Sequence, residues 1–304
     1  MIGRIARLYY EHGLTHQEIA DIFGISRVKV TRLLQEAREK GIVEIRVHSQ
    51  ASPFVDVEHA LTERFGLRQA WVAPSPSDPI KADAAFSSFG AEALKSVIDS
   101  GSTVAVSLST AVSSVSKALP TAPLGGVFVP VSGGWSGLSD GSSPAEIAML
   151  LAQRTGGRSY RLPATLVAPD SHTARATLTQ PELAQVLETA ASASILLTGI
   201  GGTGDNPGLL FNSLPDSMRS TLASGGAVGD LSGRYFDAAG ELVPSELDDR
   251  VVGLRLEHLR SIPFRIAFAH GPHKLQAMRA ALGARLVNAV VTDFDTAQSL
   301  LNEV

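Results

Sequence analysis

The chain has 304 residues, of which 44% are hydrophobic and 18% charged, so it has enough apolar material for a sizeable core and is not expected to be disordered. It contains no cysteine, which excludes a disulfide framework and any thiolate metal site. It shows neither an N-terminal signal segment nor an apolar run of about 18 residues, so we expect a cytoplasmic protein without a membrane partner. The length predicts one small and one large domain.

The net charge of −4 hides a difference between two parts of the chain. Residues 1–50 hold eight basic against six acidic side chains, whereas the remaining residues hold 18 basic against 24 acidic ones. Between Ile22 and Gln35 the charged residues are Arg27, Lys29 and Arg32, with no acid among them. A local basic patch on an acidic protein is typical of a DNA-binding domain.

The chain opens with residues that predict short helices. Apolar residues three and four apart predict a first helix over Ile2–His12, which Gly13 ends. Thr15 and Glu18 form a capping-box pattern, in which each side chain can bond to the backbone amide of the other residue. This pattern predicts a second helix that ends at Phe23.

Ser26 is the expected N-cap of a third helix, which stops at Lys40-Gly41. Val43–His48 alternates like a strand and would form a wing beside the three helices. We therefore predict a DNA-binding domain over residues 1–50, a linker over residues 51–56 and a second domain over residues 57–304.

Strand-like and helix-like runs alternate through the second domain. The expected strands are Ala70–Ala73, Thr103–Ser107, Val127–Val131, Ile195–Gly199, Val251–Leu254, Arg265–Ala269 and Leu286–Thr292. The expected helices are Ala84–Ile98, Thr110–Leu119, Pro144–Arg154, Glu182–Ala190, His273–Leu282 and Thr296–Leu301. This alternation predicts the α/β class, with a mostly parallel, doubly wound sheet and helices on both faces.

The spacing of small and apolar residues near the N-terminus predicts a helix-turn-helix. Counted from His16, Ala20 is fifth, Gly24 ninth and Val30 fifteenth, and Leu33 is eighteenth. At these positions two crossing helices require a small residue, a turn glycine and apolar packing residues. The alternative is a three-helix cap with a solvated charged face, but the capping box, the basic outer face and the expected wing favour DNA binding.

We assign the DNA contacts to the start of the second helix and to the outer face of the third. The assigned residues are Thr15, Gln17, Ser26, Arg27, Val28, Lys29, Thr31 and Arg32. Arg27 can donate two bonds to a guanine edge, and Thr31 can contact a base or a thymine methyl. Lys29 and Arg32 suit phosphates, although Arg27 and Arg32 could exchange these roles.

The stretches RIARLYYEHGLTHQEIADIFGISRVKVTRLLQEAREKGIVEIRV and GAVGDLSGRYFDAAGELVPSELDDRVVGLRLEHLRSIP resemble the SorC family of sugar-responsive transcription regulators. AHGPHK and LVNAVVTDFDTAQSLL, which follow them, resemble the same family. The resemblance implies a winged helix-turn-helix joined to a Rossmann-like sensor domain related to sugar-phosphate isomerases and deaminases. It also implies homodimers or homotetramers on palindromic double-stranded operator DNA.

The resemblance places an effector site at the carboxyl ends of the sheet strands, where open α/β sheets bind ligands. The implied site residues are Ser107, Ser109, Thr110, Gly133, Gly134, Gly199, Gly201, Gly202, Asp230, His270 and Lys274. Asp230 would bind sugar hydroxyls, and Lys274 would bind a phosphate or hydroxyl, which favours a phosphorylated effector slightly. Leu108 and Ser109 replace the family's Trp-Gly, and Ser132 replaces a basic residue found in some members, which argues against a bisphosphate.

Each of these features also has a purely structural interpretation. A glycine-rich loop after a strand is often a tight turn, Asp230 could cap a turn, and Lys274 could be a solvated residue at a helix start. The resemblance, rather than the residues alone, favours a ligand site.

An enzyme fused to a DNA-binding domain is the alternative function. Residues 199–212 are similar to a deaminase signature in which Asp-Gly-His follows Gly-x-Gly, but here Asp205 is followed two residues later by Pro207. Without the histidine that would transfer protons, we expect no enzyme activity. The eight histidines show no metal-binding spacing, so we expect neither a metal nor a cofactor. The sequence thus predicts a repressor of a carbohydrate operon, controlled by a sugar or sugar phosphate.

Overall fold

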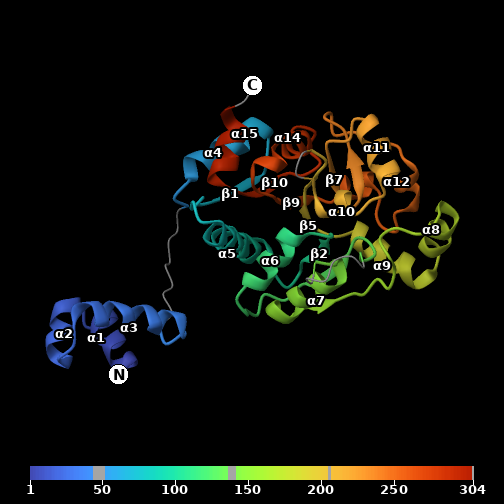
Figure 1. Ribbon diagram of the computed structural model, residues 1–304. Helices are drawn as coiled ribbons and strands as arrows, with labels where there is room; N and C mark the ends of the chain where they lie inside the picture. Colours follow the sequence, from blue (N-terminus) through green and yellow to red (C-terminus); the bar gives the residue numbers. More distant parts are fainter. Residues whose placement is uncertain (44–51, 136–141, 205–206, 303–304) are drawn as a thin grey trace. The chain divides into compact units, whose positions relative to one another are not determined.

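The structure is a computed structural model that describes residues 1–43, 52–135, 142–204 and 207–302 (Figure 1). Contacts within the chain divide it into two compact units, Met1–Ala51 and Ser52–Val304. No helix in the described ranges is long and apolar enough to cross a membrane. We call the two units the head and the sensor unit.

The head consists of three helices, α1 (Ile2–Tyr10), α2 (His16–Phe23) and α3 (Arg27–Glu39). The predicted capping box is present, since the Thr15 hydroxyl accepts from the Glu18 amide and the Glu18 carboxylate accepts from the Thr15 amide. Gly24 follows α2 in the left-handed conformation with φ 64°, and Ser26 caps α3 through the amide of Lys29. The helix predictions are therefore confirmed to within two residues of each end.

The core of the head is formed by one side of each helix. Its buried residues are Ile5, Ala6, Ile19, Ala20, Val30, Leu34 and Ala37. Ala20 and Val30 occupy positions that the helix-turn-helix spacing requires to be small or apolar. Val43 is the last described residue before a gap, so the predicted wing, Val43–His48, lies almost entirely outside the described residues.

The main sheet of the sensor unit is parallel throughout. In the described part of the chain it has seven strands in the order β1-β10-β9-β5-β2-β3-β4. The strands are β1 (Gln69–Ala73), β2 (Thr103–Val106), β3 (Val127–Pro130), β4 (Arg158–Ser159), β5 (Ile195–Gly199), β9 (Phe264–Phe268) and β10 (Ala289–Asp293). After β2 the chain continues to β3 on one side, and later enters β5 on the other side, so the winding direction reverses between β2 and β5.

Helices cover both faces of this sheet (Figure 1). One face packs against α5 (Pro79–Val97), α6 (Thr110–Ala118) and α7 (Pro144–Thr155). The other packs against α4 (Val55–Phe65), α9 (Pro181–Ala191), α13 (Leu256–Ser261), α14 (Leu275–Gly283) and α15 (Phe294–Asn302). Alternate strand residues enter the two layers: Val104 and Val106 of β2 face one, and Ala105 faces the other. The predicted α/β class with helices on both faces is confirmed.

A smaller antiparallel sheet joins the sensor unit near the carboxyl end of β5. It consists of β6 (Gly201–Gly202), β7 (Gly229–Leu231) and β8 (Arg234–Phe236), in that order. The remaining elements of the described chain are α8 (Ser171–Leu178), α10 (Leu209–Asn212), α11 (Asp216–Ser224), α12 (Glu246–Arg250) and the 3₁₀ turn η1 (Pro272–Lys274). The sequence predicted neither the three strands of this small sheet nor the helices α8, α10, α11 and α12. It included η1 in a helix predicted to begin at His273.

The prediction of a strand over Val251–Leu254 is wrong. This segment makes isolated bridges to Ser132 and Val167 but joins neither sheet. The carbonyl oxygens of Val251, Gly253 and Leu254 accept from the side chain of Arg234, so they are not available for a regular strand ladder. The other six predicted strands are confirmed, with ends displaced by up to three residues.

Candidate functional site

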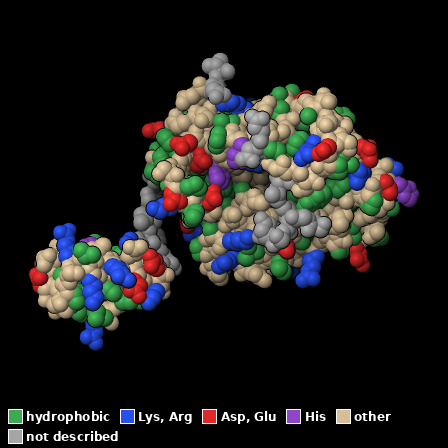
Figure 2. Space-filling view, in the orientation of Figure 1, with side chains coloured by type: hydrophobic (Ala, Val, Ile, Leu, Met, Phe, Trp, Pro, Cys, Tyr) green, Lys and Arg blue, Asp and Glu red, His purple; other side chains and the backbone are tan. Residues whose placement is uncertain are grey.

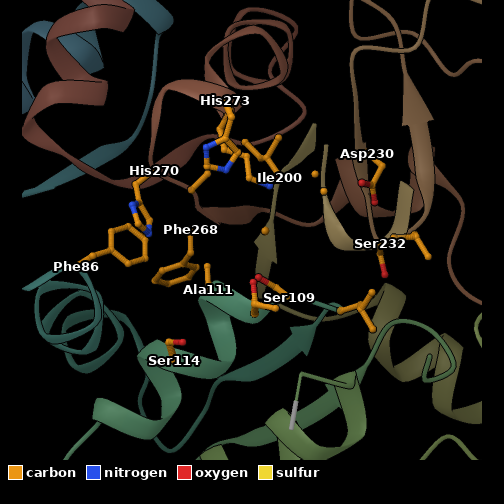
Figure 3. Close-up of a pocket in the computed structure, with 18 of the residues that line it drawn as sticks. Phe86, Ser109, Ala111, Ser114, Ile200, Asp230, Ser232, Phe268, His270 and His273 are labelled. Atoms are coloured by element: carbon orange, nitrogen blue, oxygen red, sulfur yellow. Dashed lines mark hydrogen bonds between the residues drawn. The ribbon is translucent and has the colours of Figure 1, made fainter. Parts of the chain in front are cut away.

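A cavity of about 370 Å³ lies where the winding direction of the sheet reverses (Figure 3). Its wall includes the residues that follow β2, β5 and β9, together with parts of α5 and of the β7–β8 hairpin. Parallel strands place their carboxyl ends at one edge of the sheet, so loops far apart in sequence meet there. Histidine side chains lie at the edge of this hollow with acidic side chains beside them (Figure 2).

The segment after β2 brings hydroxyl groups and helix amides to the cavity. Ser109 is the N-cap of α6, and its Oγ accepts from the Val112 amide at 3.1 Å. Thr110 and Ala111 line the cavity, and their amides have no acceptor among the described residues. Amides in the first turn of a helix attract oxygen atoms of a ligand.

The β7–β8 hairpin brings a carboxylate and another hydroxyl into the cavity wall. Asp230 is the middle residue of β7, and its Oδ2 accepts from the Gly233 amide at 2.9 Å across the turn. Ser232 and Gly233 form this turn with φ of 53° and 82°. A serine in the left-handed region is unusual, and such conformations are often found at ligand sites. Asp230 and Ser232 point toward the same space (Figure 3).

Asp230 is 7% exposed, and its environment is set by close packing. Burial raises the pKa of its carboxyl above the ordinary value, which the Gly233 amide and the charge of Lys274 partly offset. Gly201 lies directly against it, because a Cβ atom at this position would overlap Oδ1 of Asp230. Gly201 therefore makes room for the carboxylate.

Lys274 ends the 3₁₀ turn that follows β9 and extends its amine into the cavity wall. Its Nζ donates to the carbonyl oxygen of Ile200 at 2.7 Å. Burial lowers the pKa of Lys274, and the charge of Asp230 acts in the opposite direction. The two charges therefore stabilise each other across the cavity.

His270 links the cavity to the end of β10. Its Nδ1 lies 3.4 Å from Oδ2 of Asp293, and its ring stacks on Phe86 with centroids 4.2 Å apart. Burial raises the pKa of Asp293, but hydrogen bonds from His270 and Thr296 outweigh this, so the pKa lies below its ordinary value. On the other side, His270 Nε2 lies 3.8 Å from the exposed Asp83 of α5.

His273 is a cavity residue that the sequence did not identify as part of the site. Burial lowers its pKa, and the positive charges of Lys274 and His270 act in the same direction. Its ring lies close to the backbone of Gly271, whose φ is 93°.

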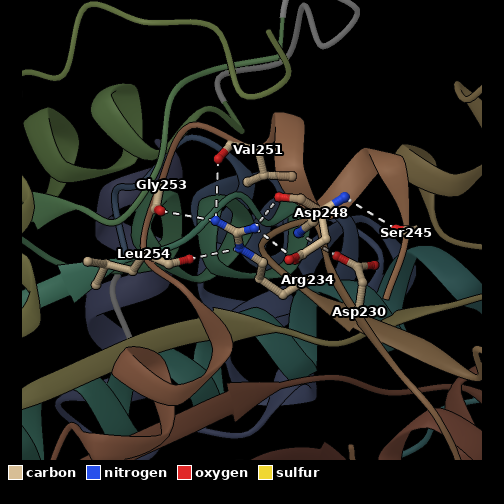
Figure 4. A network of polar contacts seen from close by, with 8 residues as sticks. Asp230, Arg234, Ser245, Asp248, Val251, Gly253 and Leu254 are labelled. Carbon is tan, nitrogen blue, oxygen red and sulfur yellow. Dashed lines mark hydrogen bonds and ion pairs between the residues drawn. The ribbon is translucent and has the colours of Figure 1, made fainter. Parts of the chain in front are cut away.

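A buried arginine fixes the hairpin that carries Asp230 (Figure 4). The guanidinium of Arg234 donates to the carbonyl oxygens of Val251, Gly253 and Leu254, and to the carbonyl and carboxylate of Asp248. The Arg234 side chain is 3% exposed and its Nη1 lies 2.7 Å from Asp248 Oδ1. All five N–H donors of the guanidinium thus hold residues 248–254 against the β7–β8 hairpin. This contact positions Asp230 and Ser232 on the hairpin.

The structure brings together seven of the effector residues expected from the sequence. Ser109, Thr110, Gly199, Gly201, Asp230, His270 and Lys274 line the cavity. Four others do not line it: Ser107, Gly133, Gly134 and Gly202. Ser107 is buried and donates to Thr198, whereas the amides of Gly133 and Gly134 donate to the carbonyls of Val252 and Ala164. A Cβ atom on Gly133 would overlap the backbone of Thr165, so close backbone packing explains this glycine.

The segment that contains Gly133 still contributes to the cavity indirectly. The Oγ atoms of Ser132 and Ser232 lie 3.1 Å apart in the interior, so the residues that follow β3 support the β7–β8 hairpin on the side away from the cavity's open space. Sequence reasoning missed Ser232, His273, Asp83 and Phe86, all of which line the cavity. The Ser-Gly pair at 232–233 is a turn signal that could have located the hairpin, and Asp78-Pro79 is a helix-start signal that could have extended α5 to include Asp83.

The outer face of α3 is open to solvent. Ser26, Arg27, Val28, Lys29, Thr31 and Arg32 are all exposed, and the apolar Val28 is 78% exposed. The side chains of Arg27, Lys29 and Arg32 form no hydrogen bond or ion pair with any described residue, whereas Thr31 bonds to the Arg27 carbonyl and lies 3.3 Å from His16. At the start of α2, Thr15 is used in the capping box and Gln17 donates to Asp21.

An open basic helix face on one unit and a ligand-sized cavity at a sheet switch point on the other define a ligand-binding transcription regulator. A family model described as "Putative sugar-binding domain" matches residues 49–302, and one described as "Crp-like helix-turn-helix domain" matches residues 4–51. The deoxyribonucleoside regulator of Bacillus subtilis (strain 168) is 31% identical over 304 residues, covering 98% of this chain and 96% of that protein.

Two further proteins support the same assignment. The transcriptional regulator LsrR of Escherichia coli (strain K12) is 30% identical, covering 99% of this chain and 94% of that protein. The full-length sorbitol operon regulator SorC from Klebsiella pneumoniae has a similar structure with a TM-score of 0.81 and 26% identity, covering 99% of this chain and 98% of that one. The chain belongs to the SorC family of sugar-binding transcriptional regulators.

Proposed function

We propose that the protein is a cytoplasmic repressor of a carbohydrate operon. In this proposal α3 of the head binds the operator DNA, and an effector bound in the cavity of the sensor unit makes the protein release that DNA. The observation that carries this proposal is the basic outer face of α3, where Arg27, Lys29 and Arg32 are exposed and free of protein partners in the described chain. Exposed Val28 adds an apolar group that suits a thymine methyl. Of the eight residues assigned to DNA contacts, those on α3 have the strongest support.

The effector is a sugar or sugar phosphate in this proposal. Relatives named as a deoxyribonucleoside regulator and a sorbitol operon regulator support a carbohydrate ligand. The seven expected residues that line the cavity form the proposed contact set, while Ser107, Gly133, Gly134 and Gly202 act by supporting the loops around it. The functional division is a DNA-binding domain over residues 1–50, a linker over 51–56 and a sensor over 57–304.

Control of DNA binding requires two heads in this mechanism. A homodimer or homotetramer would place paired α3 helices on the two halves of a palindrome, about one or two DNA turns apart. Effector binding would favour an arrangement in which both heads cannot bind at once. The shift cannot exceed the difference between the effector's affinities for the two arrangements.

We further propose that the sensor unit has no catalytic role and requires no cofactor. Its relatives are transcriptional regulators, and Pro207 occupies the position where similar deaminases carry a histidine. Incubation of the protein with sugar phosphates and amino-sugar phosphates should give no product above the control without protein. Isomerised or deaminated product that depends on the protein would contradict this part of the proposal.

DNA binding is tested with variants of α3 and an operator selected by the wild-type protein from a random duplex library. Arg27→Ala should remove about 1–3 kcal/mol of discrimination between this operator and random DNA. Lys29→Ala should weaken binding to the operator and to random DNA, and it should reduce the salt dependence of the DNA affinity. Fluorescence anisotropy at two salt concentrations measures both effects. Arg219→Ala, which removes a partly exposed positive charge from α11 of the sensor unit, is the matched control.

A further inference from the structure

Four arginines meet at the amino end of the main sheet, which is the end opposite the cavity. Arg68 precedes β1 and Arg260 belongs to α13. Arg265 lies near the start of β9, and Arg285 lies between α14 and β10. None of the four forms an ion pair with a carboxylate in the described part of the chain. We call these four residues the arginine cluster.

Backbone carbonyl groups hold the guanidinium groups of the arginine cluster next to one another. Arg68 and Arg265 donate to the two consecutive carbonyl groups at 262–263, the former at 3.1 Å. Arg260 and Arg265 donate to the two consecutive carbonyl groups at 284–285, at 3.2 and 3.1 Å. Because consecutive residues are about 3.8 Å apart, Arg265 links Arg68 and Arg260 in one group. Burial lowers the pKa of Arg265, and the charges of Arg260 and Arg68 lower it further.

Arg285 joins the cluster from an unusual backbone conformation. Its φ of 55° lies in the left-handed region, which residues other than glycine rarely adopt. Its guanidinium lies against Gly66, because a Cβ atom at residue 66 would lie 3.1 Å from Nη2 of Arg285. Backbone strain of this kind is often found at ligand-binding sites.

The arginine cluster keeps N–H groups that the described chain does not use. A guanidinium has five N–H donors. Described residues accept one hydrogen bond each from Arg68 and Arg260, and none from Arg285. Arg265 is half-buried and donates three, to the carbonyl groups that hold the two loops together. The three exposed arginines can therefore donate to a ligand, while Arg265 supports them.

A phosphate group fits this cluster better than a carboxylate does. Guanidinium groups stay protonated near pH 7, so the cluster carries four positive charges. A carboxylate would neutralise one of them, whereas a phosphate carries about −1.5 to −2 near pH 7. Arginine also binds phosphate oxygens through two parallel hydrogen bonds. Residues 51–304 hold 18 basic against 24 acidic side chains, which disfavours a long polyanion such as DNA and favours a small phosphate compound.

We propose that the amino end of the sheet holds a phosphate-binding site, in which Arg68, Arg260 and Arg285 donate to the oxygen atoms of free phosphate or of a small phosphate ester. A bound phosphate would tie α13 to the segment between α14 and β10. Phe268 of β9 lines the cavity, and Phe264 at the other end of β9 lies four residues, or about 13 Å, away. The site is therefore separate from the cavity, and it does not depend on the proposed function.

The test begins with inorganic phosphate and phenyl phosphate as probes of the full chain. Calorimetry measures their binding at constant ionic strength, with acetate as the monovalent comparison. Both phosphates should bind at least about fivefold more tightly than acetate, because they engage a further guanidinium. Phosphate should also slow hydrogen exchange of the amides at 284–288. Equal binding of acetate, or exchange that phosphate leaves unchanged in this segment, would overturn the inference.

Variants test whether the arginine cluster binds the phosphate. Arg260→Gln and Arg285→Asn each remove one charge and should weaken phosphate binding about fivefold. Asparagine tolerates the left-handed backbone at residue 285. Arg161→Gln removes an exposed charge beyond β4 and is the matched control, which should bind phosphate as the wild type does. A loss of phosphate affinity in Lys274→Gln but not in the two cluster variants would place the phosphate in the cavity and overturn the inference.

Operator binding distinguishes a small phosphate compound from the phosphates of DNA. Without added phosphate, neither Arg260→Gln nor Arg285→Asn should change the affinity for the selected operator, measured by anisotropy on variants whose tryptophan fluorescence shows them to be folded. Weaker operator binding together with unchanged phosphate affinity would assign the cluster to DNA and overturn the inference. Failure of the proposed function would appear instead as unchanged operator discrimination in Arg27→Ala, which leaves this site intact.

Discussion

The head and the cavity present their binding residues in different ways. The side chains that we propose to contact DNA come from two consecutive helices, α2 and α3, and most of them extend into solvent. The cavity residues come from segments between Asp83 and Lys274, and several are held by bonds to other parts of the sensor unit. A surface made by two consecutive helices depends on local sequence, whereas a cavity between loops depends on the packing that brings those loops together.

This difference predicts where substitutions have distant effects. A change on the outer face of α3 alters binding to DNA without altering the fold, because these side chains contact little else. A change at a residue that supports a cavity loop alters both stability and binding. Arg234 is such a residue, because it binds four residues of another segment yet belongs to the hairpin that carries Asp230.

The largest effect should follow from Arg234→Met. Removing one partner of a buried ion pair leaves the Asp248 carboxylate and the carbonyl groups of the loop without their donor, so the sensor unit should lose about 3–5 kcal/mol of unfolding free energy. Urea unfolding followed by tryptophan fluorescence measures this unit selectively, because both tryptophans, Trp71 and Trp135, belong to it.

Arg219→Met is the control for this prediction. Arg219 pairs with Asp216 on the exposed surface of α11, where ion pairs contribute about 0–1 kcal/mol. Similar losses in the two variants would mean that the Arg234 network does not stabilise the sensor unit more than a surface pair does.

An intermediate effect should follow from Thr15→Ala in the head. This change removes the acceptor for the Glu18 amide and so should cost about 1 kcal/mol of local helix stability. Hydrogen exchange of the α2 amides should become faster, while the tryptophan unfolding curve of the sensor unit stays unchanged. Gln17→Ala, which removes an exposed bond to Asp21, is the control. A shifted tryptophan curve without faster exchange in α2 would contradict the separation of the two units.

The smallest effect should be the pH dependence that His273 contributes. Its pKa in the folded protein lies below 6.5, so between these two values the unfolded chain binds more protons. The unfolding free energy should therefore fall as the pH drops from 6.5 toward the lowered pKa. The melting temperature of His273→Gln should fall less over this range than that of the wild type, and an equal fall would show that His273 does not contribute.

The sequence correctly predicted those elements whose signals lie within a few residues of one another. The capping box at Thr15 and Glu18, the left-handed Gly24 and the N-cap Ser26 each depend on near neighbours, and all three are present. Buried parallel strands such as Ile195–Gly199 were also found, because a short apolar run between turn signals is distinctive. The strand predicted at Val251–Leu254 failed because its carbonyl groups bond to Arg234, a partner that local sequence does not reveal.

The members of the cavity were predicted only in part for the same reason. Gly133 and Gly201 look alike in sequence as glycines near strand ends. Packing separates them, because Gly133 lies against the backbone of Thr165, whereas Gly201 makes room for the carboxylate of Asp230 in the cavity wall.

The sequence by itself determined the helix-turn-helix, the α/β class and the residues that α3 exposes, because these depend on periodicity, caps and turns between near neighbours. The tertiary structure decided which loops meet at the switch point between β2 and β5, and that Lys274 shares its cavity with Asp230. A charge acts over distances in space rather than along the chain, so the charge balance of the cavity is visible only when the loops are brought together.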